Sequence, residues 1–223
     1  MEKCVALHPG AVVLLEEQYR MHQDIMGFSS LQFYNARLKA NPSVADRLLL
    51  PGEPPLGFID TAGCGFDEKS EGTSTSNPEE ASFLLRHLTA LVIKLNAAYP
   101  AGDFPTVAVI SPYKHQVEIL KEQMLSHPEL VLAGAAISIN TIDSFQGQER
   151  DIVYISMTRS NNANSIGFLS DIRRMNVAMT RARKKLVVVG DSATLSQLEF
   201  YSDFVSYAQQ KDAYQSAWEF MDL

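Results

Sequence analysis

Three short, uninterrupted runs of apolar residues constrain the fold of this chain more than any other feature of its sequence. They are TVAVISP (residues 106–112), DIVYISM (residues 151–157) and KLVVVGD (residues 185–191). Runs of this kind are typical of parallel strands that are covered on both faces, because a half-exposed strand alternates polar and apolar residues instead. GFIDT (residues 57–61) and AISINTI (residues 136–142) read as two further strands.

Helical patterns separate these strands along the chain. The clearest helix begins at Pro78, with Ser76 or Asn77 as its N-cap, and another covers residues 113–125. A looser helical pattern runs from about Glu17 to Phe33. Alternating helices and strands predict an α/β fold in which a mostly parallel sheet carries helices on both faces.

Two remaining segments complete this reading. Residues 62–78 read as a long, mobile polar loop. The tail from residue 192 to residue 223 reads as one or two amphipathic helices that pack back onto the domain, with Trp218 and Phe220 expected in the core. A length of 223 residues suits one α/β domain, and we expect its core to cover residues 12–191.

Composition excludes several classes of protein. An apolar content of 46% is too high for a disordered chain. The net charge of −7 argues against a non-specific nucleic-acid protein, although a local basic groove remains compatible with it. Cys4 and Cys64 have no metal-ligand spacing and read as free thiols of a reducing compartment. No apolar run reaches the roughly 18 residues that span a bilayer, and the first ten residues lack a signal-peptide core, so we expect a cytoplasmic or nuclear protein.

The first unusual local segment is EEQYRMH (residues 16–22). Tyr19 offers a ring for stacking, and Arg20 offers a planar fork for phosphate oxygens. The alternative reading is a tyrosine in the core beside an arginine in a surface ion pair.

The second segment is INTIDSFQGQERDIVYIS (residues 139–156). Here hydroxyl groups, a glycine turn and Glu149 follow a strand, where ligands of parallel sheets bind. The alternative is a capped turn, with Asp143 or Ser144 as the cap and Gly147 as the stop.

The third segment is SDIRRMNVAMTRARKK (residues 170–185), which reads as a helix capped by Ser170 or Asp171. Arg174 and Arg181 lie on one face of this helix by their spacing. The alternative is a solvated basic helix end, which accounts for residues 183–185 through the helix dipole but explains Arg181 less well.

Taken in order, QYRMH, VAVISPYKHQ, TIDSFQGQERDIVYISMTRSN and GFLSDIRRMNVAMTRARKKLVVVGD resemble the second, C-terminal RecA-like motor domain of superfamily 1 helicases. The resemblance is to the branch of the up-frameshift and immunoglobulin mu-binding protein helicases, and it spans Leu14 to Asp191. It implies a RecA-like fold of the P-loop NTPase type and a role in an ATP-dependent helicase that moves along DNA or RNA.

The resemblance also implies roles for individual residues. Arg20 and Arg181 would reach the γ-phosphate of ATP and stabilise charge during hydrolysis. The nucleotide itself would be contacted by Gln18, by Tyr19 stacking on the base, and by Gly147 and Glu149 beside the ribose and phosphates. The single strand would be contacted by Ser111, Pro112, Tyr113, Thr141 and Ser144, and less strongly by Ser160 and Asn161.

The sequence contains no G-x-x-x-x-G-K-[ST] motif, and its only Asp-Glu pair, Asp67-Glu68, does not follow an apolar strand. We therefore expect a first motor domain, absent from this chain, to hold most of the ATP and the Mg²⁺. The isolated chain is accordingly expected to be inactive. The alternative functions are a non-catalytic module that binds nucleic acid or a partner, and a helicase-like nuclease component, for which no carboxylate cluster is visible.

Overall fold

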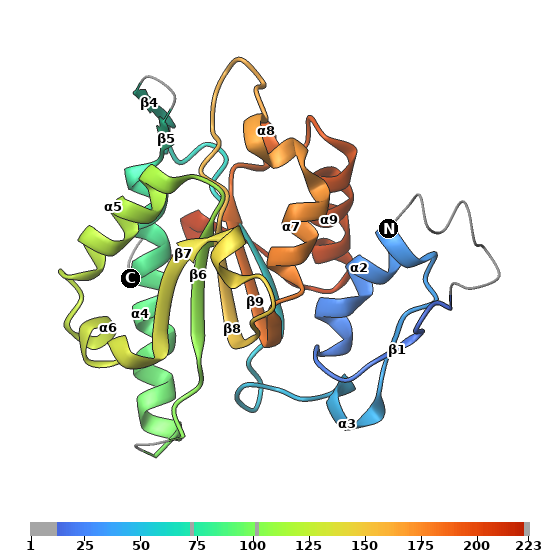
Figure 1. The fold of residues 1–223 in the computed structure, drawn as a ribbon. Coiled ribbons are helices and arrows are strands. Elements are labelled where there is room, and N and C mark those ends of the chain that lie inside the picture. The colour runs from blue at the N-terminus through green and yellow to red at the C-terminus, as the bar shows by residue number, and fades with distance from the viewer. Residues whose placement is uncertain (1–12, 72–73, 101–102, 221–223) are drawn as a thin grey trace.

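The computed structural model describes residues 13–71, 74–100 and 103–220. Its centre is a six-stranded sheet in which every neighbouring pair is parallel, with the strand order β10-β3-β9-β8-β6-β7. The predicted α/β fold with a mostly parallel sheet is confirmed, and it is the architecture expected of a RecA-like domain (Figure 1). The strands are β3 (Leu56–Asp60), β6 (Val107–Ser111), β7 (Ile137–Thr141), β8 (Arg150–Ser156), β9 (Ala182–Gly190) and β10 (Tyr214–Ser216).

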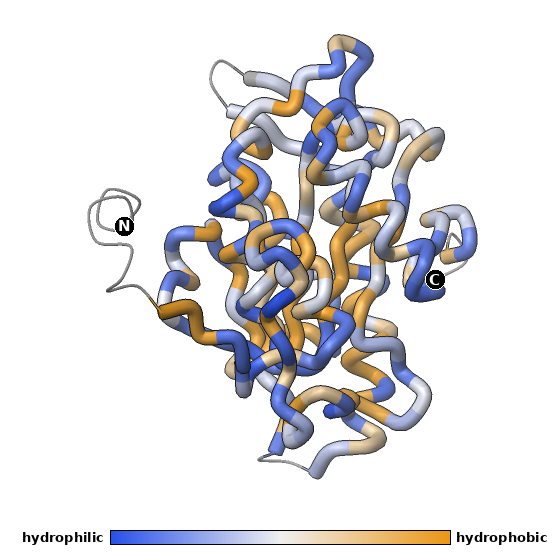
Figure 2. Tube along the Cα trace, turned by 90° about the vertical axis from the view of Figure 1, so that its right-hand side faces the viewer, coloured by the Kyte–Doolittle hydropathy of each residue, from blue (hydrophilic) through white to orange (hydrophobic). Residues whose placement is uncertain are grey.

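The central strands are buried on both faces because their alternate side chains enter two different cores. In β8, Val153 and Ile155 belong to one core and Ile152 and Tyr154 to the other. Figure 2 shows the hydrophobic segments gathered in the interior of the molecule. The uninterrupted apolar runs of the sequence are therefore a direct result of two-sided burial.

One core lies beneath α4 (Pro78–Ala98), α5 (Lys114–Met124) and α6 (Pro128–Leu132). The opposite core lies beneath α2 (Gln23–Tyr34), α7 (Ile172–Met179) and α9 (Glu199–Gln210), as Figure 1 shows. The predicted cap of the long helix is confirmed: Asn77 Oδ1 accepts a hydrogen bond from the backbone N–H of Glu80 at 2.9 Å. The shorter elements are α3 (Pro42–Ala45), α8 (Ser192–Leu195), β1 (Glu17–Gln18), β2 (Lys39–Ala40), β4 (Lys69–Glu71), β5 (Ser74–Ser76), η2 (Gly134–Ala136), η3 (Ile142–Phe145), η4 (Gly167–Ser170) and η5 (Ala217–Phe220).

The predicted helix from about Glu17 is wrong in its first turn. Residues 17–18 form β1, which pairs with β2, and α2 begins only at Gln23 with His22 as its N-cap. Tyr19 and Arg20 therefore lie in a bend before the helix.

The predicted helix over residues 170–185 is also too long. Asp171 caps it as predicted, but α7 ends at Met179 and β9 begins at Ala182. Residues 183–185 belong to β9, which pairs with β8 and β3, rather than to a helix end, and acidic residues of neighbouring segments pair with their side chains. Lys184 lies 3.3 Å from Asp151 of β8, and Lys185 lies 2.8 Å from Glu53.

Two further expectations are corrected at the edges of the domain. The described part of the tail contains two helices, α8 and α9, within the expected number, but strand β10 follows them and was not expected. Trp218 is 61% exposed rather than in the core, while Phe220 packs against Phe83 and His87. Within residues 62–78, β4 and β5 form a small hairpin. Among the described residues no helix is long and apolar enough to cross a membrane, and Cys4 lies outside them.

Candidate functional site

Three arginine side chains lie near one carboxylate at the surface of the domain. Arg20 Nε lies 2.8 Å from Glu149 Oε2, and Arg183 Nε lies 3.7 Å from Glu149 Oε1. Arg181 is close enough to both Arg20 and Glu149 for their charges to affect its pKa. The structure thus brings together Arg20, Arg181 and Glu149, which the sequence selected from three separate segments.

Local hydrogen bonds explain why Arg20 points into this cluster. The side-chain oxygen of Gln18 accepts from the backbone N–H groups of Arg20 and Met21, each at 2.8 Å, and its amide nitrogen donates to the Met21 carbonyl. Gln18 therefore shapes the tight bend that presents Tyr19 and Arg20. The Arg20 guanidinium also donates to the Thr180 carbonyl at 3.2 Å, which ties the bend to the end of α7.

Arg181 occupies the junction between α7 and β9. Its Nε donates to the Val177 carbonyl at 2.9 Å, and another guanidinium nitrogen donates to the Gln148 carbonyl at 3.2 Å. Partial burial, followed by the positive charge of Arg20, lowers the pKa of Arg181, while Glu149 opposes the shift. Because Arg20 and Arg183 both pair with Glu149 and Arg181 lies close to them, the cluster carries local positive charge that an incoming anion would stabilise.

Two more predicted nucleotide contacts lie near this cluster in the sequence and are open to solvent. The Tyr19 side chain is 65% exposed, and its hydroxyl donates to Glu17 Oε2 at 3.0 Å. Gly147 adopts a φ of +79°, and a Cβ added there would meet no atom within 4 Å, so its backbone can be approached closely. A ring and a bare backbone turn are suitable surfaces for a base and for phosphate oxygens.

A groove of about 330 Å³ lies at the carboxyl ends of β6 and β7. Pro112, Tyr113 and Thr141, three of the residues predicted to contact a single strand, line it together. Ser144 borders the same turn, where its hydroxyl lies 3.4 Å from that of Thr141. The sequence did not select the other lining residues, which include Ser74, Thr75, Lys114, His115, Asp143, Phe168 and Arg174.

The predicted contact from Ser111 does not fit this arrangement. Its side chain is fully buried, and its hydroxyl lies 3.0 Å from that of Thr158 and accepts from the backbone N–H of Tyr113. Ser111 therefore stabilises the turn that carries Pro112 and Tyr113, and its hydroxyl does not face the groove.

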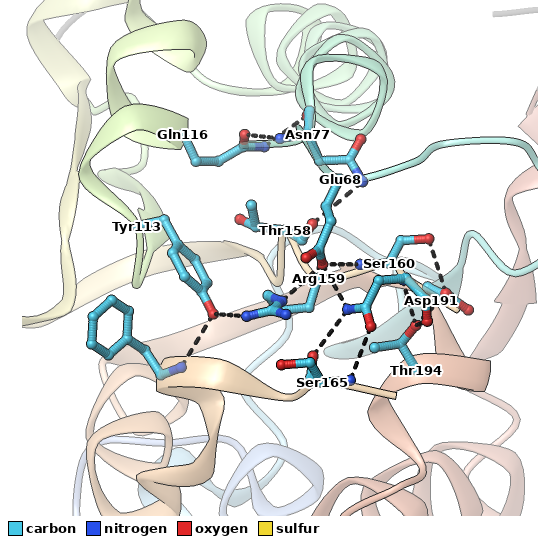
Figure 3. Close-up of polar contacts among 12 residues, drawn as sticks. Glu68, Asn77, Tyr113, Gln116, Thr158, Arg159, Ser160, Ser165, Asp191 and Thr194 are labelled. Atoms are coloured by element: carbon cyan, nitrogen blue, oxygen red, sulfur yellow. Dashed lines mark hydrogen bonds and ion pairs between the residues drawn. The ribbon is translucent and has the colours of Figure 1, made fainter. Parts of the chain in front are cut away.

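Ser160 and Asn161 lie apart from that groove. They line a different cavity of about 450 Å³, together with Asp67 and Asp191. Ser160 Oγ donates to Asp191 Oδ2 at 3.0 Å, and Asn161 Nδ2 donates to Glu68 Oε2 at 2.8 Å (Figure 3). With carboxylates around them, these two residues are poorly placed for phosphate contacts.

Sequence reasoning did not single out Arg159, which the structure places behind the groove in contact with Tyr113. It is 8% exposed, and it bridges Glu68 and the Tyr113 hydroxyl. A signal was present, since Arg159 follows a buried strand in the motif TRSN. Among the described residues no group of three or more His, Cys, Asp or Glu side chains is arranged to hold a metal ion.

Comparison with known proteins shows the family to which the chain belongs. A family model described as AAA domain matches residues 1–193. The chain belongs to this family, the up-frameshift type of superfamily 1 helicases. The resemblance inferred from the sequence motifs is thereby confirmed.

Three curated relatives show how this helicase domain relates to longer proteins. DNA-binding protein SMUBP-2 of Mesocricetus auratus is 41% identical over 235 residues, which cover 100% of this chain and 22% of that protein. DNA polymerase alpha-associated DNA helicase A of Saccharomyces cerevisiae is 39% identical over 204 residues, covering 83% of this chain and 28% of that protein. Uncharacterized ATP-dependent helicase MJ0104 of Methanocaldococcus jannaschii is 34% identical over 223 residues, covering 93% and 31% respectively. The helicase domain thus spans less than a third of each of these relatives.

Proposed function

We propose that this domain is the C-terminal motor domain of an ATP-dependent helicase, in which it supplies arginine fingers and one part of the single-strand groove. The observation that carries the proposal is the meeting of Arg20 and Arg181 around Glu149. These arginines come from opposite ends of the described chain, yet one carboxylate lies beside both of them. An ATP-dependent helicase among the relatives supports the choice of nucleotide.

The arrangement suggests how the cluster works. Glu149 compensates the charge of Arg20, and its carboxylate lies 2.8 Å from the guanidinium. A γ-phosphate brought up by a P-loop domain carries more negative charge than one carboxylate and takes over the arginine hydrogen bonds. Glu149 is then released to accept a hydrogen bond from a ribose hydroxyl, and Tyr19 stacks on the base.

The guanidinium groups of the cluster are suited to bind ATP but not Mg²⁺. Guanidinium groups bind phosphate oxygens, whereas Mg²⁺ needs oxygen ligands such as carboxylates. Among the described residues no group of three or more His, Cys, Asp or Glu side chains is arranged to hold a metal ion, and the proposal assigns the Mg²⁺ and the β-phosphate to the partner P-loop domain, whose motif is suited to both. Mg²⁺ would neutralise charge on the transferring phosphoryl group once it is bound there.

The groove at Pro112, Tyr113 and Thr141 is the proposed path of the single strand, DNA or RNA. Its serine and threonine hydroxyls and the cationic side chains of Lys114 and Arg174 are suited to the phosphate backbone, which carries no sequence information. Between this groove and the arginine cluster runs one continuous segment, from Thr141 through η3 to Glu149. Strand binding and nucleotide binding would therefore act on the same short piece of chain.

The decisive experiment places Arg181→Ala in a protein that joins this chain to a P-loop motor domain. Loss of the finger should lower the rate of ATP turnover by roughly 10³- to 10⁵-fold while nucleotide binding is largely retained. Arg37→Ala is a matched control, because Arg37 pairs with Glu16 on an exposed surface outside the cluster. Loss of nucleotide binding with normal turnover of the bound fraction would give Arg181 a different role.

The alternative, a binding module without catalysis, follows from the lack of a Walker A motif in this sequence. The purified chain on its own should hydrolyse ATP at background rate under either proposal. The two differ in the joined protein, where a pure binding module would show no dependence of ATP turnover on Arg20 or Arg181.

A further inference from the structure

Glu68 holds the loop that follows β8 through its side chain and its backbone. Its Oε2 accepts hydrogen bonds from Arg159 Nε at 2.8 Å, from the Ser160 backbone N–H at 3.0 Å and from Asn161 Nδ2 at 2.8 Å (Figure 3). The backbone N–H of Glu68 in turn donates to the Ser160 carbonyl at 3.0 Å. One residue of the 62–78 segment thus binds three consecutive residues of another loop.

We propose that Glu68 is a positioning residue for the single-strand groove, which it shapes through Arg159 and Tyr113. This inference rests on the function proposed above for that groove. Glu68 itself lines neither the groove nor the arginine cluster, so its effect must pass through other side chains.

The ion pair between Glu68 and Arg159 is largely shielded from water. The two side chains are 11% and 9% exposed, so neither charge has a good alternative partner in solvent. A buried charge that loses its partner is strongly destabilised, and it moves to regain hydration. The position of the Arg159 guanidinium therefore depends on Glu68.

Arg159 passes this constraint to the wall of the groove. A second guanidinium nitrogen of Arg159 donates to the Tyr113 hydroxyl at 3.4 Å, and that hydroxyl also accepts from the Phe168 backbone N–H at 3.2 Å. The rings of Tyr113 and Phe168 lie 5.5 Å apart, and both residues line the groove. A Cβ at Gly167 would clash with the Arg159 guanidinium and lie 2.7 Å from the Tyr113 hydroxyl, so a side chain at that position would have to displace both groups.

The backbone of the loop stores strain that the surrounding contacts must hold. Thr158 has a φ of +71°, a conformation that is unfavourable for a β-branched residue. Its N–H donates to buried Glu80 at 2.9 Å, and its carbonyl accepts from Asn77 at 3.4 Å. Glu80 and Asn77 thus hold the backbone of Thr158, and Glu68 holds the next three residues of the loop.

The segment that carries Glu68 also reaches the groove directly. The hairpin of β4 and β5 follows Glu68 in the chain, and Ser74 and Thr75 of β5 line the groove together with Tyr113 and Phe168. Glu68 therefore connects the start of this hairpin to the loop that supports Tyr113. Its contacts link two segments that line the groove.

The test measures binding of the full chain to a fluorescent single-stranded homopolymer oligonucleotide. Glu68→Gln should weaken binding about tenfold, the effect of losing one hydrogen bond to a charged group. Asp67→Asn is the matched control, because it removes the same charge from the same loop at an exposed side chain. If only the lost negative charge mattered, both variants would bind the anionic strand more tightly than the unmodified chain. The positioning role instead predicts weaker binding by Glu68→Gln, so the two explanations predict opposite changes in affinity.

A coupled variant shows whether the effect passes through Tyr113. Tyr113→Phe removes only the hydroxyl group. If Glu68 acts through that hydroxyl, the double variant Glu68→Gln/Tyr113→Phe should bind the oligonucleotide no more weakly than whichever single variant binds it less tightly. Additive losses, or unchanged or tighter binding by Glu68→Gln, would overturn the positioning role. If Glu68→Gln does not fold, Arg159→Lys replaces it, since lysine keeps the charge but cannot bridge to both partners. Failure of the unmodified chain to bind any single strand would instead refute the proposed function.

Discussion

The contribution of Glu80 to the stability of this domain should fall as the pH rises, whereas that of most carboxylates falls as the pH drops. Its side chain is fully buried in the first turn of α4, and Oε1 accepts from Ser156 Oγ at 2.5 Å and from the Thr158 N–H at 2.9 Å. Oε2 has no hydrogen-bond partner among the described residues. Burial raises the pKa of Glu80 from 4.5 to about 8, although both hydrogen bonds oppose this shift.

The sign and size of the effect follow from proton binding. Between pH of about 4.5 and about 8 the folded state keeps a proton on Glu80 that the unfolded state has released. The contribution of Glu80 is therefore fully present below the unfolded pKa and is lost as the pH rises through the folded pKa. One proton corresponds to about 1.4 kcal/mol per pH unit, so roughly 4 kcal/mol should be lost across three pH units of that window.

Glu80→Gln tests this reasoning, because glutamine keeps the Oε1 acceptor and does not titrate. We expect the free energy of unfolding of the variant, measured by urea denaturation at several pH values, to rise relative to the unmodified chain as the pH increases. The difference between the two proteins is the useful quantity, since other groups also titrate: burial lowers the pKa of His87 to about 4.

The adjacent residue provides the control. Partial burial alone would raise the pKa of Glu79, but the hydrogen bonds from Lys69 and the backbone together with the charge of Lys69 outweigh it and lower this pKa, so Glu79→Gln should give no such rise above pH of about 5. Parallel stability curves for the unmodified chain and Glu80→Gln across the window would show that Glu80 is ionised in the folded state and would refute the reasoning.

Three other substitutions have defined outcomes. Lys185→Ala should lower the free energy of unfolding by roughly 3–5 kcal/mol in chemical denaturation, because it leaves the Glu53 carboxylate without its buried partner at 2.8 Å; Lys94→Ala, which removes the exposed partner of the same carboxylate, should cost far less. Gly147→Ala should cost about 1–2 kcal/mol through its φ of +79° alone, since no atom blocks the added methyl group, and an unchanged denaturation midpoint would contradict that conformation. Tyr19→Ala in the joined two-domain protein should weaken nucleotide binding about tenfold in a fluorescence titration without lowering stability, because the ring is 65% exposed; Tyr19→Phe should bind normally if stacking is the cause.

The sequence predicted the sheet well where burial itself determines the residue type. The runs around β6, β8 and β9 must be apolar because both faces of those strands enter a core. The cap at Asn77 was also predictable, since it depends only on neighbouring backbone groups. Strand β10 was missed because Tyr214, Gln215 and Ser216 carry no strand pattern of their own and form a strand only by pairing with β3.

The start of β9 shows a different reason for error. Arg183, Lys184 and Lys185 resemble a helix end, but each has an acidic partner from another segment. Two of those partners, Glu149 and Asp151, lie at the start of the neighbouring parallel strand β8. Such pairings depend on sheet order, which no local pattern contains. The convergence of Arg20 and Arg181 has the same origin, and it could be expected only from the resemblance to a family.

The pairing of β10 with β3 also has a consequence for the order in which the domain can assemble. Tyr214 pairs with Phe58, so the sheet edge at β3 stays open until more than 150 further residues have been synthesised. Contacts between such distant segments slow folding, and an unpaired strand edge can recruit another chain in the meantime. A nascent chain that has not yet reached β10 is therefore the form of this protein most exposed to aggregation, and α9, which packs on the neighbouring core just before β10, brings the last strand to its place.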